Sequence, residues 1–146
     1  MYSLRLAVRE DAPAIRRLIW QVHINPTGLD WRRFVLAVDP AGRLLGCGQL
    51  KPHRDGTVEL ASIAVRPGFR QQGIARAVIE RLLAGAGRPI YLVCAYPLQG
   101  FYERFHFHVI GPAEMPPSYH RQWQFINRLK KLLPKGTAGL LVMKLD

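Results

Sequence analysis

Residues whose types could do chemistry gather in the stretch AVRPGFRQQGIARAVIERLL, residues 64–83. An apolar run ends at a proline there, and a helix-like run with an apolar stripe follows. Gly73 and Ala75 leave the backbone nearly uncovered, while Arg70 and Arg76 supply positive charge. Because a helix N-terminus carries unpaired N–H groups and about half a positive charge, this junction predicts a site for an anion such as a pyrophosphate.

An ordinary loop with scattered arginines is the alternative, because (Arg/Gln)-x-x-Gly-x-(Gly/Ala) is a short pattern that arises by chance. The context of the pattern favours the anion site. A strand-like run precedes it, Pro67 ends that run, and an amphipathic helix pattern follows it.

Hydrophobic periodicity predicts the elements that must position this junction. Predicted strands are Ser3–Val8, Phe34–Val38, Leu44–Lys51, Thr57–Val65, Pro89–Ala95, Phe107–Ile110 and Gly139–Leu145. Predicted helices are about 11–23, capped by Asp11 with Pro13 in its first turn, about 73–84, and 98–105. This order predicts an α+β fold with a mixed central sheet of about seven strands flanked by helices, a meander followed by a β-α-β unit.

Length and composition predict a single domain over residues 1–146, because 49% of the 146 residues are hydrophobic. No apolar run approaches the roughly 20 residues that span a bilayer, and the N-terminus becomes charged too early for a secretion signal. Cys47 and Cys94 lie inside apolar runs, so we expect buried free thiols and a cytoplasmic protein.

The net charge of +11, from 21 basic and 10 acidic residues, favours anionic partners. Nucleic acid, acidic protein, a membrane surface and a phosphorylated ligand all satisfy it, and the excess is spread along the whole chain. We find no recognised nucleic-acid-binding motif, so the charge alone names no partner.

Two segments resemble one known family. The stretch ELASIAVRPGFRQQGIA is similar to the strand, (Gln/Arg)-x-x-Gly-x-(Gly/Ala) loop and helix of the GNAT superfamily of acyl-CoA-dependent N-acetyltransferases, and FYERFHF, residues 101–107, resembles a second family segment. The resemblance implies the GNAT fold, with the sheet splayed between its fourth and fifth strands. It also implies acetyl-CoA as co-substrate and no metal.

The resemblance further implies which residues bind the coenzyme. Backbone groups of the fourth strand would bind the pantetheine arm, with one N–H polarising the thioester carbonyl, and the loop and helix start would hold the pyrophosphate. The residues concerned are Ile63, Ala64, Val65, Arg70, Gln71, Gln72, Gly73, Ile74, Ala75 and Arg76.

By the same resemblance, two residues carry the proton transfers. Tyr102 stands where the family commonly keeps a tyrosine acid near the sulfur, and its alternative is a core aromatic residue. Glu59 stands where some histone-acetylating members carry a glutamate base. Its alternative is a strand carboxylate that pairs with an arginine or lysine on a neighbouring strand, because many members deprotonate the amine through water and backbone.

The chain departs from the family pattern at three positions. His106 stands where the family often has glycine, and Tyr96 and Gln99 stand where it often has asparagine and alanine. His106 and His108 alternate as metal ligands on a strand would, but no third ligand of fitting spacing appears, so we interpret them as ordinary surface or turn histidines.

The acceptor side is less defined. Residues 25–31, flanked by Trp20, are our prediction for the pocket wall, and His23 and His53 lie at element ends that could line it. The stretch 119–133 has one apolar helical face and no acidic residue. It is interpreted as a helix packed on the sheet, with a basic docking surface for an anionic acceptor or partner as the alternative.

The leading hypothesis is an N-acetyltransferase that moves an acetyl group from acetyl-CoA to a primary amine, on a small molecule or a protein, by direct attack in a ternary complex. A non-catalytic acyl-CoA-sensing or partner-binding module with the same fold is the second hypothesis. A transferase acting on charged RNA is the third. The identity of the amine and a homodimeric state are left open.

Overall fold

The computed structural model describes residues 1–130 and 139–146, which form two compact units. The first unit comprises residues 1–51 and 60–86, and the second comprises residues 52–59 and 87–146. Strand β4 (Val58–Val65) begins in the second unit and continues in the first. The expectation of one domain over residues 1–146 stays a prediction.

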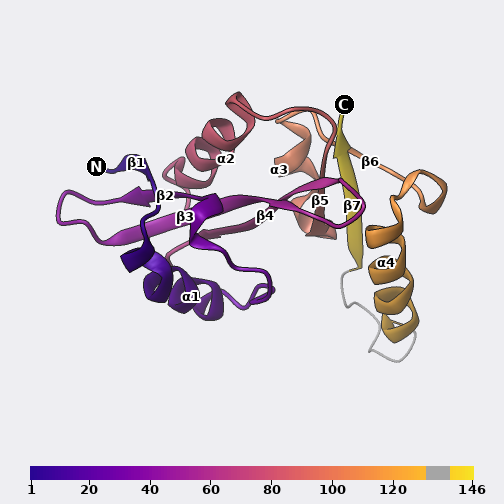
Figure 1. Ribbon diagram of the computed structural model, residues 1–146, viewed down its shortest axis with the longest axis horizontal. Coiled ribbons are helices and arrows are strands. Elements are labelled where there is room, and N and C mark those ends of the chain that lie inside the picture. The colour runs from indigo at the N-terminus through magenta and orange to yellow at the C-terminus, as the bar shows by residue number, and fades with distance from the viewer. Residues whose placement is uncertain (131–138) are drawn as a thin grey trace. The chain divides into compact units, whose positions relative to one another are not determined.

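The first unit is an antiparallel meander between two helices. Its strands are β1 (Ser3–Leu6), β2 (Phe34–Val38), β3 (Leu44–Pro52) and most of β4, and its helices are α1 (Ala12–Gln21) and α2 (Ile74–Ala84). The two helices lie on opposite faces of β2 and β3 (Figure 1). All five residues of β2 are buried, because a helix covers each face of this strand.

One face of the meander forms a core with α1. The helix places Ile15, Leu18 and Ile19 against Phe34 and Leu36 of β2, and all five side chains are at most 2% exposed. These strand residues are two apart, so they point to the same face of the sheet. The apolar alternation in β2 therefore fixes which side of the sheet α1 covers.

Helix α2 packs on the opposite face of the meander, at two glycines of β3. A β-carbon at Gly48 would lie 2.5 Å from Ile63 Cδ1 and 2.9 Å from Val78 Cγ1, and one at Gly46 would lie 2.6 Å from Ile74 Cγ2. Both distances at Gly48 and that at Gly46 are shorter than real Cβ contacts. The two missing side chains allow the helix to pack directly on the backbone of β3.

The second unit pairs three further strands with the beginning of β4. These strands are β5 (Ile90–Ala95), β6 (His108–Val109) and β7 (Leu140–Leu145), and its helices are α3 (Gln99–Glu103) and α4 (Pro117–Lys130). Strand β5 is parallel to β4, with Glu59 opposite Tyr91, and β7 is antiparallel to both β5 and β6. Within residues 1–130 and 139–146, no helix combines the length and the apolar character needed to cross a membrane.

The strand order confirms the predicted mixed sheet of seven strands. It is β1-β2-β3-β4-β5-β7-β6, with the helices on its faces. The last strand in the sequence lies between β5 and β6, a position that the sequence did not predict. Pairing between β4 and β5 is recorded at the single position Glu59–Tyr91, and the splay beyond it stays a prediction.

Helix α4 packs on the sheet of the second unit through an aromatic face. Tyr119 is 1% exposed and Trp123 is half-buried, in one cluster with Tyr91 of β5 and Val142 of β7. This confirms the predicted packing face for Tyr119 and Trp123. The helix begins two residues before the predicted start, and the expected residues 131–133 lie outside the described ranges.

One predicted helix cap is wrong. Asp11 was expected to cap α1, but its carboxylate makes no cap hydrogen bond to that helix. The carboxylate instead accepts two bonds from the Arg5 guanidinium, at 2.7 and 2.9 Å, and one from the Val8 N–H at 2.7 Å. A bidentate arginine is a stronger partner than a helix N–H, and the bond from Arg5 lowers the pKa of Asp11.

Both cysteines are free and buried, as predicted. Cys47 lies on the α1 face of β3 and donates to the Ser62 carbonyl at 3.6 Å, whereas Cys94 of β5 lies 3.8 Å from the Met143 sulfur. Burial raises the pKa of Cys47 to about 12 and the pKa of Cys94 to about 11.

Gly48→Ala tests the close approach of α2 to β3. We expect a loss of about 1–3 kcal/mol in the free energy of unfolding, because the added methyl must displace Ile63 and Val78. Gly85→Ala is the control, since nothing lies within 4 Å of a β-carbon there. Chemical denaturation measures both, and equal midpoints for the two variants would contradict the constraint.

Candidate functional site

The loop after β4 is anchored to β3 within the first unit. Arg66 donates from its backbone N–H to the Leu45 carbonyl at 2.7 Å and from Nε to the Leu44 carbonyl at 2.8 Å. The Arg43 guanidinium lies over the Phe69 ring, 5.2 Å from its centre. These contacts fix where the loop leaves the sheet and therefore where α2 begins.

The loop presents its backbone to solvent at the start of α2. Gln71 and Gly73 have φ values of +63° and +78°, and Gly73 precedes the first residue of the helix. Left-handed residues that alternate with right-handed ones turn successive N–H groups toward one side in an anion-binding nest, and Gln71 and Gly73 supply the two left-handed residues of such a turn. Only Tyr2 Oη, at 3.9 Å, lies near the position of a β-carbon on Gly73, so the cradle is open.

The N–H groups of this cradle have no competing partner. In the described part of the chain, no backbone N–H from residues 70–76 donates a recorded hydrogen bond, and Gly73 supplies no side-chain cap. The first turn of a helix always leaves such donors unsatisfied. A bound anion would satisfy them.

Two cations accompany the cradle. Arg70 is exposed, and Arg76 pairs with Glu80 at 2.9 Å while both side chains stay more than half exposed. An exposed pair of this spacing stabilises a helix by only about 0.3–0.5 kcal/mol, so a doubly charged ligand can compete for Arg76. The Ile74 side chain is buried in the core, which leaves its backbone as the part that faces the loop.

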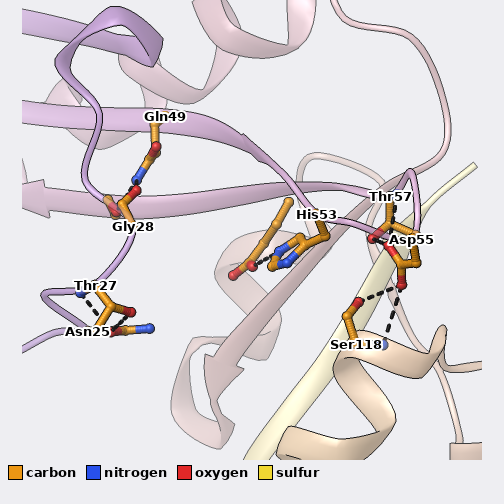
Figure 2. Close-up of polar contacts among 10 residues, drawn as sticks. Asn25, Thr27, Gly28, Gln49, His53, Asp55, Thr57 and Ser118 are labelled. Atoms are coloured by element: carbon orange, nitrogen blue, oxygen red, sulfur yellow. Dashed lines mark hydrogen bonds and ion pairs between the residues drawn. The ribbon is translucent and has the colours of Figure 1, made fainter.

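Strand β4 carries a backbone irregularity just before residues 63–65. Ser62 has φ +59°, in the left-handed region that serine rarely adopts within a strand. Its hydroxyl accepts a bond from Gln49 Nε2 at 2.9 Å, and the same amide nitrogen donates to the Gly28 carbonyl at 3.2 Å (Figure 2). Gln49 is fully buried and its Oε1 has no hydrogen-bond partner among the described residues, a feature that sequence reasoning missed.

A histidine and a carboxylate meet in the second unit. His53 Nε2 lies 2.7 Å from Glu59 Oε1, and the side chains are 14% and 15% exposed. The hairpin between β3 and β4 brings them together, because the His53 N–H donates to the Thr57 carbonyl at 2.9 Å. Glu59 therefore pairs with a histidine, where its structural alternative named an arginine or a lysine, and its role in catalysis stays a prediction.

Aromatic rings enclose the pair. The Tyr119 ring stands edge-on to the His53 ring at 5.3 Å and stacks on the Tyr91 ring at 5.3 Å. The Tyr119 hydroxyl is buried without a hydrogen-bond partner among the described residues. Burial, together with the charge of Glu59, raises the pKa of Tyr119, so this phenol stays neutral.

A clasp joins the hairpin to the start of α4. The Asp55 carboxylate accepts from Thr57 Oγ1 at 2.6 Å and from Ser118 Oγ at 2.7 Å (Figure 2). It also accepts from the backbone N–H groups of both residues, at 3.0 and 3.4 Å. These bonds lower the pKa of Asp55 and hold Tyr119, the next residue of the helix, over His53.

Tyr102 of α3 is a buried phenol with some access to solvent. It is 9% exposed, and its ring meets Phe101 and Phe107 edge-on. Burial raises the pKa of Tyr102 to about 12. Its hydroxyl has no recorded hydrogen bond among the described residues, yet it is not among their fully buried unpartnered atoms.

The sequence matches the acetyltransferase (GNAT) family over residues 5–107, most of the chain. The chain belongs to this family. That result confirms the resemblance in the loop and helix start, and the seven-stranded mixed sheet with its parallel β4–β5 pair is the fold of the GNAT acetyltransferases.

Individual relatives match this chain either over a short segment or at low sequence identity. Human serotonin N-acetyltransferase is 40% identical over 68 residues, which cover 42% of this chain and 33% of the length of that curated relative. Among solved structures, Rv2747 from Mycobacterium tuberculosis in complex with CoA and NLQ is similar with a TM-score of 0.72, 22% identity and 98% coverage of both chains. N-acetylglutamate synthase from Neisseria gonorrhoeae, complexed with coenzyme A and L-arginine, has a TM-score of 0.72, 18% identity, and coverage of 99% of this chain and 33% of that one.

His106 explains one departure from the GNAT pattern. Its φ is +72°, in the region where glycine is the unstrained residue, and its N–H donates to the Glu103 carbonyl at 2.9 Å in the turn that ends α3. The glycine common at this position in the family has a conformational reason. His108 lies 3.7 Å from the carboxylate of Asp146, and the described residues contain no group of three or more potential metal ligands.

Part of the predicted acceptor wall lines a cavity of the first unit. The cavity has a volume of about 520 Å³, and its lining includes Gly28, Trp31 and Arg16. His23 lies elsewhere, at the end of α1, with φ +59°, and Trp20 is 62% exposed. The structure therefore brings part of the predicted wall together and leaves His23 and Trp20 outside that lining.

Asp55→Ala tests the clasp. Because the pKa of Asp55 is lowered in the folded protein, its stabilisation is present above the ordinary aspartate range near about 4, and is lost as the pH falls through the lowered value. We expect the variant to lose about 1 kcal/mol at pH 7, since solvent screens this exposed group, and to match the wild type in strong acid. Thermal unfolding across pH measures the difference, and a gap that widens toward acid would contradict it.

Proposed function

We propose that this GNAT acetyltransferase moves an acetyl group from acetyl-CoA to a primary amine by direct attack in a ternary complex. The open cradle at Gly73 carries the proposal, because it combines unsatisfied N–H groups, a left-handed glycine and nearby cations. The CoA found with the two structural relatives supports the same ligand class. Serotonin N-acetyltransferase and N-acetylglutamate synthase are named for different acceptors, so the proposal extends to primary amines as a class.

The coenzyme would lie along the first unit. Residues 70–76 would bind the pyrophosphate through N–H groups and the guanidinium of Arg70 or Arg76. Backbone groups of Ile63, Ala64 and Val65 would bind the pantetheine arm as an added strand does. The left-handed Ser62 supports this role, because it interrupts the regular strand immediately before Ile63.

The reaction requires two proton movements. The amine nitrogen attacks the thioester carbonyl carbon, a C–N bond forms, and the C–S bond breaks to release the CoA thiolate. The amine must lose its extra proton first, since an alkylammonium titrates near about 10. As the amide forms, the nitrogen gives up a second proton and the thiolate takes one up, directly or through solvent, which gives an N-acetylamine and free CoA thiol.

Tyr102 is the proposed donor to the sulfur. With its pKa at about 12, the phenol is protonated at neutral pH. Complete transfer to a thiolate with a pKa near about 8.5 would cost roughly 5 kcal/mol, because each pKa unit corresponds to about 1.4 kcal/mol. Tyr102 therefore stabilises the leaving thiolate by a hydrogen bond, and solvent supplies the proton after release.

Gly73→Val tests the cradle. The added side chain would cover the N–H groups and strain a residue at φ +78°, so we expect CoA affinity to fall at least about 100-fold in calorimetry. Gly42→Val is the matched control, because Gly42 has φ +83° and equally open surroundings. Equal CoA affinity of both variants, or no CoA binding by the wild type, would overturn the proposed function.

Tyr102→Phe tests the donor. We expect kcat to fall about 10- to 100-fold, with little change in CoA affinity, because the ring packing is kept and only the hydroxyl is lost. Thiol release from acetyl-CoA against a panel of primary amines measures turnover. Phe101→Leu is the control for aromatic packing in α3, and unchanged turnover in Tyr102→Phe would remove the assigned role.

A further inference from the structure

In the His53–Glu59 pair, one nitrogen of the imidazole ring contacts the carboxylate and the other has no recorded hydrogen bond among the described residues. Nε2 lies 2.7 Å from the Glu59 carboxylate oxygen, and no recorded hydrogen bond within residues 1–130 and 139–146 involves the side-chain Nδ1. An ionised carboxylate only accepts hydrogen bonds, so Nε2 carries the hydrogen in the neutral ring. The lone pair is then on Nδ1, where the ring can accept a proton.

The surroundings favour a transient positive charge on this ring. Glu59 on β4 lies 2.7 Å from the ring and Tyr119 on α4 stands edge-on to it, with Tyr91 of β5 stacked behind Tyr119, while Arg54 and Asp55 follow His53 in the turn. The Glu59 carboxylate lies against the ring at hydrogen-bonding distance, where it attracts a positive charge, and Tyr119 stays neutral. With 14% of its side chain exposed, His53 is shielded from bulk water but still accessible.

An imidazole is also better matched to the task than the carboxylate. A free imidazole titrates about two pH units closer to an alkylamine than a free carboxylate does. The nearest oxygen of Glu59 already accepts the His53 hydrogen. Glu59 is therefore better suited to orient the His53 ring than to act as the base itself.

We infer that His53 takes the proton that the acceptor amine must lose, and that Glu59 is the positioning residue that fixes its tautomer. This inference rests on the proposed acetyl transfer. The ammonium N–H bond breaks and its proton moves to Nδ1, while the neutral amine keeps the electron pair that attacks the thioester carbonyl. The imidazolium then returns the proton to solvent, so the pair is unchanged after one turnover.

His53→Gln is the primary test. Glutamine keeps a donor for Glu59 but cannot take up a proton, so we expect kcat to fall about 100-fold and the acidic limb of the pH–rate profile to disappear. CoA affinity should stay within about twofold. His120→Gln is the matched control, because His120 lies on α4, stacks on Trp123, and is outside the pair.

Glu59→Gln separates the two roles. Without the carboxylate the tautomer and orientation of the ring are no longer fixed, so kcat should fall about 10-fold while the acidic limb remains. If Glu59 were the base, this variant would abolish the limb and His53→Gln would keep it. The double variant should be no slower than His53→Gln alone, because the two residues act as one unit.

Two further readouts complete the test. In ¹⁵N NMR, the neutral His53 ring should carry its hydrogen on Nε2, and added imidazole should restore part of the activity of His53→Ala even if the glutamine variant folds poorly. If the wild type releases thiol and His53→Gln does so at the same rate with the same acidic limb, the inference about His53 is overturned but the proposed function is not. Absence of thiol release with every amine would overturn the proposed function together with it.

Discussion

The structure of the first unit depends on two missing β-carbons in β3. At Gly46 and Gly48 the α2 side chains Ile74, Val78 and Leu82 lie where ordinary strand residues would place their own side chains. This close contact fixes α2 against the sheet and, with it, the position of the first turn of the helix. The exposed N–H groups of residues 71–76 therefore have a rigid base, which an anion site built from backbone requires.

The second unit uses a different principle, local hydrogen bonding around one hairpin. His53, Asp55 and Glu59 lie within seven residues, so no long loop must be ordered to bring them together. The Asp55 carboxylate accepts hydrogen bonds from Thr57 and Ser118 rather than from His53. That division leaves Glu59 as the hydrogen-bond partner of the histidine, and it fastens the aromatic cover of α4 to the same hairpin.

Much of the fold follows from sequence pattern. The bounds of β2 and the end of α2 were predicted to the residue, because β2 is buried throughout and Gly85 ends the helix. The loop and the helix start were found because glycine and arginine types there have a specific physical use. The position of β7 between β5 and β6 was not predictable, since a long insertion precedes that strand and its apolar alternation does not name its neighbours.

The candidate site was predicted in part, for physical reasons that differ by residue. The left-handed Ser62 gave no signal, because serine is an ordinary strand residue and only its bond to Gln49 accounts for it. Hydrogen-bonding geometry at Asp11 was missed because the guanidinium of Arg5 competed with the helix. The contact between His53 and Glu59 could have been predicted from the sequence, because a turn at residues 53–56 folds β4 back beside β3.

The burial of Cys47 and Cys94 has a practical consequence. With thiol pKa values of about 12 and about 11, almost no thiolate exists on this chain at neutral pH. Disulfide-based dyes and mild oxidants react with thiolates, so we expect the folded protein to react with them far more slowly than free CoA does. Colour developed by such a dye during turnover of acetyl-CoA is then expected to come from the released CoA thiol rather than from the two cysteines of the protein.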